Sequence, residues 1–244
     1  ASNGRILVAR FDGSRFDLNV IHRFPNSVTN ILGQYHWDVV RLYNELLAGA
    51  QMFAHQQGGA LAGIGVDTWG VDFGLLDRAG RLLGNPVGYR DARTDEMPDA
   101  LCNEIPKGEI FGLVGTHFRQ FNTLFQLMAM RRQGDPQLDY AETLLFTPDL
   151  LNYWLTGAKA AEYTIASTSM MLHARARRWV TELLDRLEIP GKILPQLVQP
   201  GTVLGSIQPH IAAETGLDAA TPVIAVASHD TASAVAAVPG LDAN

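Results

Sequence analysis

The sequence predicts an α/β fold in a single domain. Its 244 residues alternate apolar runs of strand length with segments of helical periodicity, the order typical of α/β proteins. One run, residues 222–227, is apolar throughout and ends in Ser228-His229-Asp230. Such a strand is expected to be buried on both faces, and open α/β sheets bind ligands at the carboxyl ends of their strands. No internal repeat, linker or low-complexity tract divides the chain.

The first third of the chain predicts a sheet with one long helix packed against it. Residues 5–11 and 15–24 alternate apolar positions on either side of Asp12-Gly13, so we expect two antiparallel strands joined by a turn. Residues 37–57 repeat apolar positions at helical spacing, and Gly58-Gly59 ends that helix. Residues 61–66 predict a buried strand, parallel to 222–227 and in one mixed sheet with the first two strands.

The rest of the chain mixes short strands with several helices. Residues 71–77 predict a strand, and residues 82–89, beyond a turn at 78–80, predict its partner. A further strand is expected at 144–146. Pro148 favours a helix start at 147, and Gly157 favours its end. Other helices are expected at 96–105, 107–114, 123–133, 179–187 and 210–215.

Composition excludes several classes of protein. The net charge is −6 with a pI near 5.6, which argues against a nucleic-acid surface rich in Lys and Arg. Cys102 is the single cysteine, so no disulfide framework is possible and a reducing cytoplasm is expected. No apolar stretch approaches the ~18 residues of a membrane span. The N-terminus lacks the pattern of a signal peptide.

Two acidic segments are candidate sites. Asp67 and Asp72 flank Trp69-Gly70, which fits either a ligand-binding wall or a strand with a bulge. Asp230 fits either a carboxylate facing the ligand crevice or the N-cap of the next helix. Adjacent residues have diverging side chains, so residues 228–230 do not form a hydrolase triad. The sequence has no metal-ligand spacing, no Walker A motif and no G-x-G-x-x-G motif.

Seven segments, in this order and spacing, together resemble the N-terminal domain of the FGGY family of carbohydrate kinases. The segments that carry the resemblance are 1–5, 65–73, 89–94, 121–127, 148–157, 162–164 and 227–234. The resemblance implies a ribonuclease-H-like fold, as in actin and Hsp70, with a mixed sheet and flanking helices. It also implies that residues 1–244 are the sugar-binding domain, truncated at both ends. The first strand and the C-terminal domain would then lie outside the chain, leaving one side of the strand at 61–67 without a partner.

The resemblance implies transfer of phosphate from ATP, with Mg²⁺, to the 1-hydroxyl of L-rhamnulose. Asp230 matches the catalytic base, and Gly70, His229, Asp230 and Thr231 match ketose-binding positions. Ala1, Ser2, Asn3, Gly4 and Arg5 match the first phosphate-binding hairpin. No residue here matches the metal-linked acid, which the family carries on the strand before residue 1.

An aspartate that accepts a hydroxyl proton suits in-line phosphoryl transfer, and backbone N–H groups of a Gly/Ser hairpin can bind phosphate. Two alternatives remain: a kinase for another ketose, such as fuculose or xylulose, and a truncated, non-catalytic module that binds sugar or a partner. The expected partners are a ketose and ATP, with no nucleic acid and no membrane; the sequence sets no oligomeric state.

Overall fold

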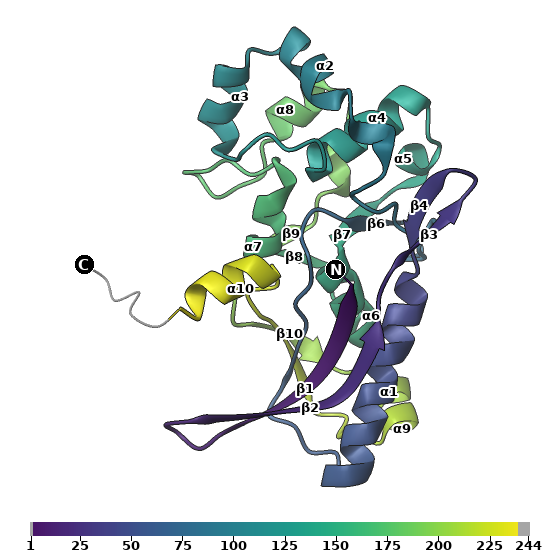
Figure 1. Cartoon of the computed structure of the whole chain (residues 1–244), viewed down its shortest axis with the longest axis vertical. Helices are drawn as coiled ribbons and strands as arrows, with labels where there is room; N and C mark the ends of the chain where they lie inside the picture. Colours follow the sequence, from purple (N-terminus) through teal and green to yellow (C-terminus); the bar gives the residue numbers. More distant parts are fainter. Residues whose placement is uncertain (1, 239–244) are drawn as a thin grey trace.

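The computed structural model describes residues 2–238, and it confirms the predicted α/β class (Figure 1). The strands are β1 (Asn3–Phe11), β2 (Phe16–Pro25), β3 (Val28–Ile31), β4 (Gln34–Trp37), β5 (Ile64–Gly65), β6 (Phe73–Leu76), β7 (Thr143–Phe146), β8 (Ala160–Glu162), β9 (Gln196–Val198), β10 (Thr202–Ser206) and β11 (Pro222–Ala225). The α-helices are α1 (Val39–Gln57), α2 (Met97–Glu104), α3 (Lys107–Val114), α4 (Thr123–Gln133), α5 (Gln137–Tyr140), α6 (Thr147–Thr156), α7 (Tyr163–Ala166), α8 (Thr181–Arg186), α9 (Pro209–Thr215) and α10 (Asp230–Ala236). Short 3-10 turns are η1 (Ala92–Thr94), η2 (Ser167–Ser169) and η3 (Gly191–Ile193). None of the described helices is long and apolar enough to cross a lipid bilayer.

The first two strands form the predicted antiparallel hairpin. β1 pairs with β2 along its whole length, ending at the pair Phe11 and Phe16. The carboxylate of Asp12 accepts a hydrogen bond from the N–H of Ser14 at 2.8 Å, and Gly13 has a φ of 100°. That backbone conformation favours glycine, so the turn forms where Asp-Gly stands.

The long helix α1 forms where its periodicity and its end signals predict it. The Asp38 side chain accepts a hydrogen bond from the Arg41 N–H at 3.0 Å and caps the first turn. At the other end Gly58, with a φ of 90°, donates its N–H to the Ala54 carbonyl at 2.9 Å. A left-handed residue at this position is the common way to end a helix.

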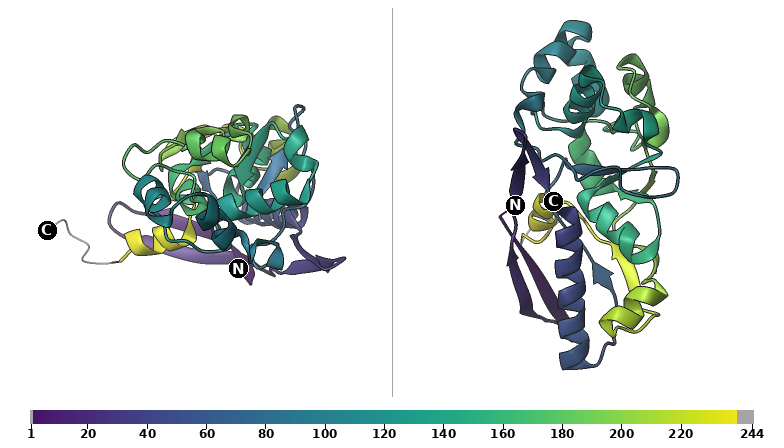
Figure 2. Two further views of the ribbon diagram at one scale, coloured as in Figure 1. Left: turned by 90° about the horizontal axis from the view of Figure 1, so that it is seen from above. Right: turned by 90° about the vertical axis from the view of Figure 1, so that its right-hand side faces the viewer.

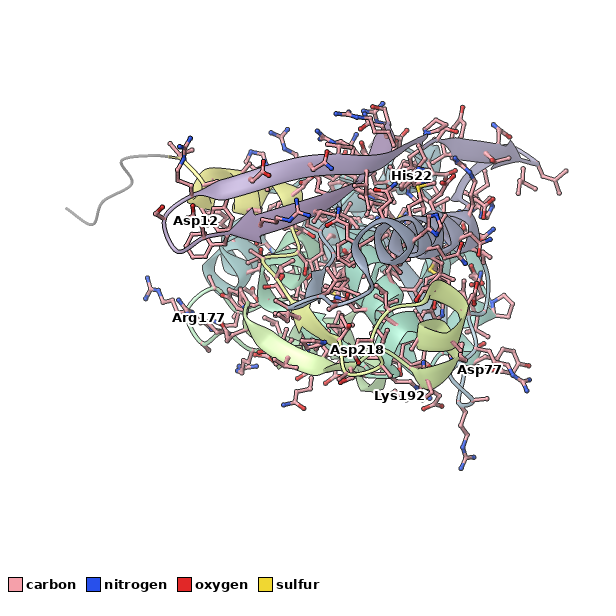
Figure 3. All side chains as sticks on the ribbon, turned by 90° about the horizontal axis from the view of Figure 1, so that it is seen from below. Asp12, His22, Asp77, Arg177, Lys192 and Asp218 are labelled. Atoms are coloured by element: carbon pink, nitrogen blue, oxygen red, sulfur yellow. The ribbon has the colours of Figure 1, made fainter. Side chains whose placement is uncertain are left out.

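Helix α1 packs against one face of the β1–β2 hairpin. His22 lies between the two-stranded ribbon and α1 (Figure 3), and its Nε2 is 2.6 Å from a carboxylate oxygen of Glu45. Gly49 permits the close approach, because a Cβ there would lie 2.5 Å from a side-chain carbon of Ile6. The second view of Figure 2 shows the helix running beside the hairpin.

The prediction of one mixed sheet is wrong in one respect, because β1 and β2 form a sheet separate from that of β5 and β11. β11 pairs in parallel with β5, as expected, and antiparallel with β10, which the sequence did not predict. Within residues 2–238, β5 has a strand on one side only, and β1 pairs with β2 alone. The expected gap beside residues 61–67 is therefore confirmed, and it separates β5 from β1.

The strand predicted at 71–77 also pairs differently. It is the shorter β6, and its antiparallel partner is β7 rather than residues 82–89. Residues 82–89 touch β6 through a bridge between Leu82 and Leu76, and Val87 forms another bridge with His36. Apolar alternation in 82–89 therefore reflects packing beside the sheet. All four residues of β6 and all four of β7 are buried.

The predicted helices occur where they were expected. The predictions for 96–105, 107–114, 123–133, 179–187 and 210–215 correspond to α2, α3, α4, α8 and α9, and α6 has Pro148 in its first turn and Gly157 at its end. Figure 1 shows α2, α3, α4 and α8 gathered at one end of the molecule, and the hairpin, α1 and α9 at the other. The largest apolar core lies beneath the first group and includes Leu101, Ile110, Leu124, Phe125, Phe146, Ile165 and Leu184.

Candidate functional site

The ends of β5 and β11 bring two acidic segments together. These strands are parallel, so residues 67–69 and 228–230 leave the sheet at the same edge. Beyond the strands the pairing continues: the Thr68 N–H donates to the Ser228 carbonyl, and the Asp230 N–H donates to the Thr68 carbonyl, both at 2.9 Å. The sequence prediction that residues 228–230 face a ligand-binding edge is consistent with this geometry.

Asp67 and Asp230 line a cavity at this edge, beside the side of β5 that has no partner strand among residues 2–238. Its walls come from the start of β1, the end of β2, α1 and the loops after β5 and β11. The polar side chains and glycine that line it are Asn3, Gly4, Arg5, Asn26, Asp67, Thr68 and Asp230. The cavity therefore combines the residues expected to hold phosphate with the aspartate expected to act on the sugar.

Asp230 is the first residue of α10, directly after the N-cap residue His229. Its Oδ1 accepts hydrogen bonds from the N–H of Thr231 at 2.6 Å and from the Thr231 hydroxyl at 3.0 Å. A carboxylate in the first turn of a helix is stabilised by the helix dipole. The side chain is half exposed, so a ligand in the cavity can reach it.

Asp67 lies on the same cavity as Asp230. Burial raises the pKa of the Asp67 carboxyl above its usual value, and the negative charge of Asp230 raises it further. The Arg5 cation acts in the opposite direction on that pKa. The two carboxylates and the guanidinium thus share one electrostatic environment, although they come from three separate parts of the chain.

Gly70 begins a strained turn between β5 and β6. A Cβ on Gly70 would lie 2.8 Å from Cγ2 of Thr168, so the chain passes close to η2 there. Val71 has a φ of 71°, a genuine outlier for a β-branched residue. Its N–H donates to Thr168 Oγ1 at 2.9 Å, and its carbonyl accepts from the Thr123 hydroxyl at 2.7 Å. These bonds hold the turn in an unfavourable conformation.

Asp72 is not part of a ligand-facing wall, because its side chain is fully buried. Oδ2 accepts hydrogen bonds from the indole N–H of Trp37 at 2.6 Å, that of Trp69 at 2.8 Å and the Tyr89 N–H at 3.2 Å. Oδ1 accepts from Gln126 Nε2 at 3.1 Å. Burial raises the pKa of Asp72 to about 6, against the opposing effect of these donors. Asp72 therefore stabilises the turn between β5 and β6 from its buried side, through these hydrogen bonds.

The residues expected to bind phosphate lie at the start of β1. Asn3, Gly4 and Arg5 are paired with β2 on one side and line the cavity on the other. Ser2 lies one residue earlier, and its carbonyl accepts a hydrogen bond from the Asn26 N–H at 3.0 Å. Ala1 lies outside the described residues.

Gly70, His229 and Thr231 do not line this cavity in the described structure. His229 Nε2 is 3.8 Å from Asp230 Oδ1, and Thr231 donates both hydrogen bonds to that oxygen. Gly70 packs against Thr168. The structure thus groups His229, Asp230 and Thr231 closely, whereas Gly70 belongs to the neighbouring turn.

The acidic residues at the cavity fit a metal that arrives with a nucleotide. Mg²⁺ prefers oxygen donors and in nucleotide sites is bound by one or two carboxylates together with phosphates. Asp67 and Asp230 bring two carboxylates to one cavity. Across residues 2–238, no group of three or more His, Cys, Asp or Glu side chains is placed to hold a metal ion by itself.

Sequence reasoning missed two groups of residues around the site. One is the set of donors to Asp72, since Trp37 and Gln126 are remote from it in the sequence. The other is Glu162 and Thr164, whose side chains bind the backbone of residues 228–229. The second group had a signal, because Glu162-Tyr163-Thr164 was one of the segments that carried the resemblance.

Comparison with known proteins agrees with this geometry. The profile described as "FGGY family of carbohydrate kinases, N-terminal domain" matches residues 20–237. A rhamnulokinase of Bacteroides thetaiotaomicron is 43% identical over the whole chain, which spans 50% of that protein. A rhamnulokinase of Enterococcus faecalis is 40% identical over 99% of the chain and 48% of its own length. The chain thus spans about half the length of these curated relatives.

Solved structures agree on the fold. A ligand-bound xylulose kinase from Lactobacillus acidophilus matches 90% of the chain and 46% of its own with a TM-score of 0.81 at 19% identity. A xylulose kinase from Rhodospirillum rubrum matches 96% of the chain and 48% of its own, also with a TM-score of 0.81, at 20% identity. The predicted ribonuclease-H-like fold is therefore confirmed. The chain belongs to the FGGY family of carbohydrate kinases.

Proposed function

We propose that this chain is the sugar-binding half of a kinase that transfers phosphate from ATP to the 1-hydroxyl of L-rhamnulose. The observation that carries the proposal is the cavity where Asp230 and Asp67 face Asn3, Gly4 and Arg5. Such a site places a proton acceptor next to groups suited to phosphate. The choice of L-rhamnulose rests on relatives named rhamnulokinase that are 36–43% identical across at least 98% of the chain.

Asp230 acts as the general base in this proposal. A sugar hydroxyl is a poor nucleophile, and a positioned carboxylate accepts its proton as the bond to phosphorus forms. The backbone of Asp230 is fixed by Thr68, while its side chain remains half exposed at the cavity. The base is thus held in place by its main chain and remains accessible to a hydroxyl group.

Arg5 and the start of β1 bind the transferred phosphate. Asn3, Gly4 and Arg5 line the same cavity as Asp230. Backbone N–H groups and a guanidinium are suitable donors to phosphate oxygens. Mg²⁺ would arrive with the nucleotide, with Asp67 as a further carboxylate ligand, and would supply neutralising charge on the phosphates.

The ketose is placed by the residues next to Asp230. His229 and Thr231 flank the base, and Gly70 begins the turn that follows Trp69 at the cavity wall. A strained turn such as that at Val71 is a recurrent feature of binding sites, because surrounding contacts hold it in one shape. We infer that this turn sets the shape of the sugar pocket.

The test is a coupled assay of ADP release with the full-length protein that contains this chain. L-rhamnulose, L-fuculose and D-xylulose are compared as acceptors, and Asp230→Asn serves as the inactive control. The proposal expects the highest kcat/KM with L-rhamnulose. A higher kcat/KM with another ketose would change the proposed substrate but would still support a sugar kinase. ADP release with none of them would favour a non-catalytic sugar-binding module.

The chain alone is expected to bind ketose weakly and to release no ADP. It spans about half of its relatives, so groups that the whole kinase places around ATP are supplied by the other half. An open site keeps its hydrogen-bonding groups hydrated, and such bonds contribute little net affinity. Calorimetry with L-rhamnulose and an ADP-release assay measure the two halves of this expectation. Sugar-dependent ADP release by residues 1–244 would contradict it.

A further inference from the structure

Three successive backbone amides lead into α10, and each has a different hydrogen-bond acceptor. The Ser228 N–H donates to Glu162 Oε2 at 3.0 Å, and the His229 N–H donates to Thr164 Oγ1 at 3.2 Å. The Asp230 N–H donates to the backbone carbonyl of Thr68 at 2.9 Å. Two of the three acceptors are therefore side chains at the end of β8 and the start of α7, remote in sequence from residue 230.

Both carboxylate oxygens of Glu162 accept hydrogen bonds in this arrangement. Its side chain is completely buried, and its two oxygens accept hydrogen bonds from the N–H groups of Thr164 at 2.7 Å, Ile165 at 3.1 Å and Ser228 at 3.0 Å. Oε2 also accepts the hydroxyl proton of Thr164. A buried carboxylate needs such donors, because leaving it unpaired costs several kcal/mol.

The Thr164 hydroxyl connects the carboxylate to the loop. It donates to Glu162 Oε2, which leaves the lone pairs of Oγ1 to accept the His229 N–H. The direction of both bonds is thus fixed by the carboxylate. Glu162 is itself located by its own N–H, which donates to the buried Asp149 Oδ1 at 3.1 Å. The chain of contacts runs from α6 through Glu162 and Thr164 to His229.

We infer that Glu162 and Thr164 are positioning residues that hold the main chain of residues 228–229 so that the Asp230 carboxylate points into the cavity. This inference rests on the proposed function for its kinetic consequence. Within residues 2–238 no hydrogen bond or ion pair joins Asp230 to either residue, and its own side-chain hydrogen bonds are to the adjacent Thr231. Its position therefore depends on how the backbone is anchored. A displacement of about 1 Å can cost about 10²-fold in rate.

The kinetic test compares Thr164→Val with Thr164→Ser in the full-length protein. Valine has the shape of threonine without the hydroxyl, whereas serine keeps the hydroxyl. We expect Thr164→Val to lower kcat about 10- to 10²-fold with a smaller change in KM, and Thr164→Ser to restore most of kcat. Equal kcat for the wild type and Thr164→Val would overturn the inference.

Thr215→Val is the matched control. Thr215 is buried, whereas Thr164 is partly buried. Like that of Thr164, its hydroxyl donates to one group, the Ile211 carbonyl at 2.7 Å, and accepts from another, the Leu217 N–H at 3.4 Å. It lies at the end of α9, which packs against α1. We expect Thr215→Val to lower stability by a similar amount without changing kcat. A similar fall in kcat for Thr215→Val would attribute the effect to general destabilisation and overturn the inference.

A second measurement separates failure of this inference from failure of the proposed function. Hydrogen exchange at the Ser228 and His229 amides reports the anchoring directly and needs no enzymatic activity. We expect about tenfold faster exchange at His229 in Thr164→Val, the usual scale for one lost hydrogen bond. We also expect faster exchange at Ser228 in Glu162→Met, which removes the oxygen that accepts its N–H. Unchanged exchange in both variants would overturn the anchoring. A wild type without kinase activity but with these exchange changes would overturn the proposed function alone.

Discussion

The indole N–H of Trp37 donates to the carboxylate of Asp72 at 2.6 Å, which ties the end of β4 to the turn before β6. Trp69 donates to the same oxygen, and the two indole rings lie 4.4 Å apart between centroids. A buried anion is thus enclosed by two aromatic donors. Because Trp69 also lines the cavity, its hydrogen bond to Asp72 fixes the position of one wall of the site.

Asp72 should make the stability of the domain depend on pH. Its pKa is about 6 in the folded protein, against about 4 in an unfolded chain. The folded state therefore binds the proton more tightly, and the stabilising contribution is present below about pH 4 and lost as the pH rises through about 6. A pKa difference of about two between the folded and unfolded states corresponds to roughly 3 kcal/mol in the free energy of unfolding.

Urea unfolding of the wild type and of Asp72→Asn at several pH values measures this effect. Asparagine does not titrate in this range, so the difference between the two proteins isolates residue 72. We expect the wild type to lose roughly 2–3 kcal/mol relative to Asp72→Asn between pH 4 and pH 7. A difference in unfolding free energy that stays constant over this range would contradict the prediction.

Gly70→Ala should strain the turn at the site. The new Cβ would lie 2.8 Å from Cγ2 of Thr168, and overpacking of this kind costs about 1–3 kcal/mol. Thr168→Ser removes that methyl group and keeps the oxygen that accepts the Val71 N–H. The double variant should recover part of the unfolding free energy lost in Gly70→Ala. Additive losses from the two substitutions would show that this contact is not the cause.

Gly49→Ala should destabilise the protein even though alanine favours helices. A Cβ at residue 49 would meet Ile6 at 2.5 Å, where α1 crosses β1. Gly112 is the matched control, since it also lies within a helix, α3, and a Cβ there has no described neighbour within 4 Å. Gly112→Ala should stabilise by about 0.5–1 kcal/mol, the usual gain in helix propensity. Thermal unfolding that shifts equally and in the same direction for both variants would refute the close-packing explanation.

Asp230→Asn should lower kcat of the full-length kinase by about 10²- to 10⁴-fold, the range for loss of a positioned general base. Ketose affinity should change much less, because asparagine keeps one acceptor. Asp218→Asn is a suitable control, since Asp218 lies in the exposed turn before β11, where it accepts the Ala220 N–H at 2.9 Å. Steady-state kinetics with L-rhamnulose measure both variants. Near-normal kcat in Asp230→Asn would remove Asp230 from the role of base.

Local signals in the sequence were sufficient for the elements with a strong period or a clear end. The Asp12-Gly13 turn and the amphipathic α1 with Gly58 at its end are examples. Pairing between strands was harder to predict, because apolar alternation at 82–89 does not reveal that β7 occupies the edge of β6. The hairpin of β3 and β4 and the strands β8, β9 and β10 also escaped prediction.

The sequence predicted which segments form the site, but not the contacts that each side chain makes. The strand run ending in Asp230 indicated a ligand-facing edge, and the structure brings Asp230 to a cavity with Asp67. The sequence left open whether Asp72 faces a ligand, and its burial depends on Trp37 and Gln126, whose proximity arises only from the tertiary fold. The contact of Glu162 with residue 228 also arises only from the tertiary fold, although Glu162 lies in one of the segments that carried the resemblance.

The parallel pairing of β5 with β11 has a consequence for biosynthesis. β5 leaves the ribosome long before β11 is translated, because the helices α2 to α9 lie between them in the sequence. Until β11 emerges, the nascent chain carries an open strand edge of the kind that chaperones recognise. We expect translation-arrested chains that stop before Pro222 to remain protease-sensitive around β5. Arrested chains that expose α10 outside the ribosome should be resistant there.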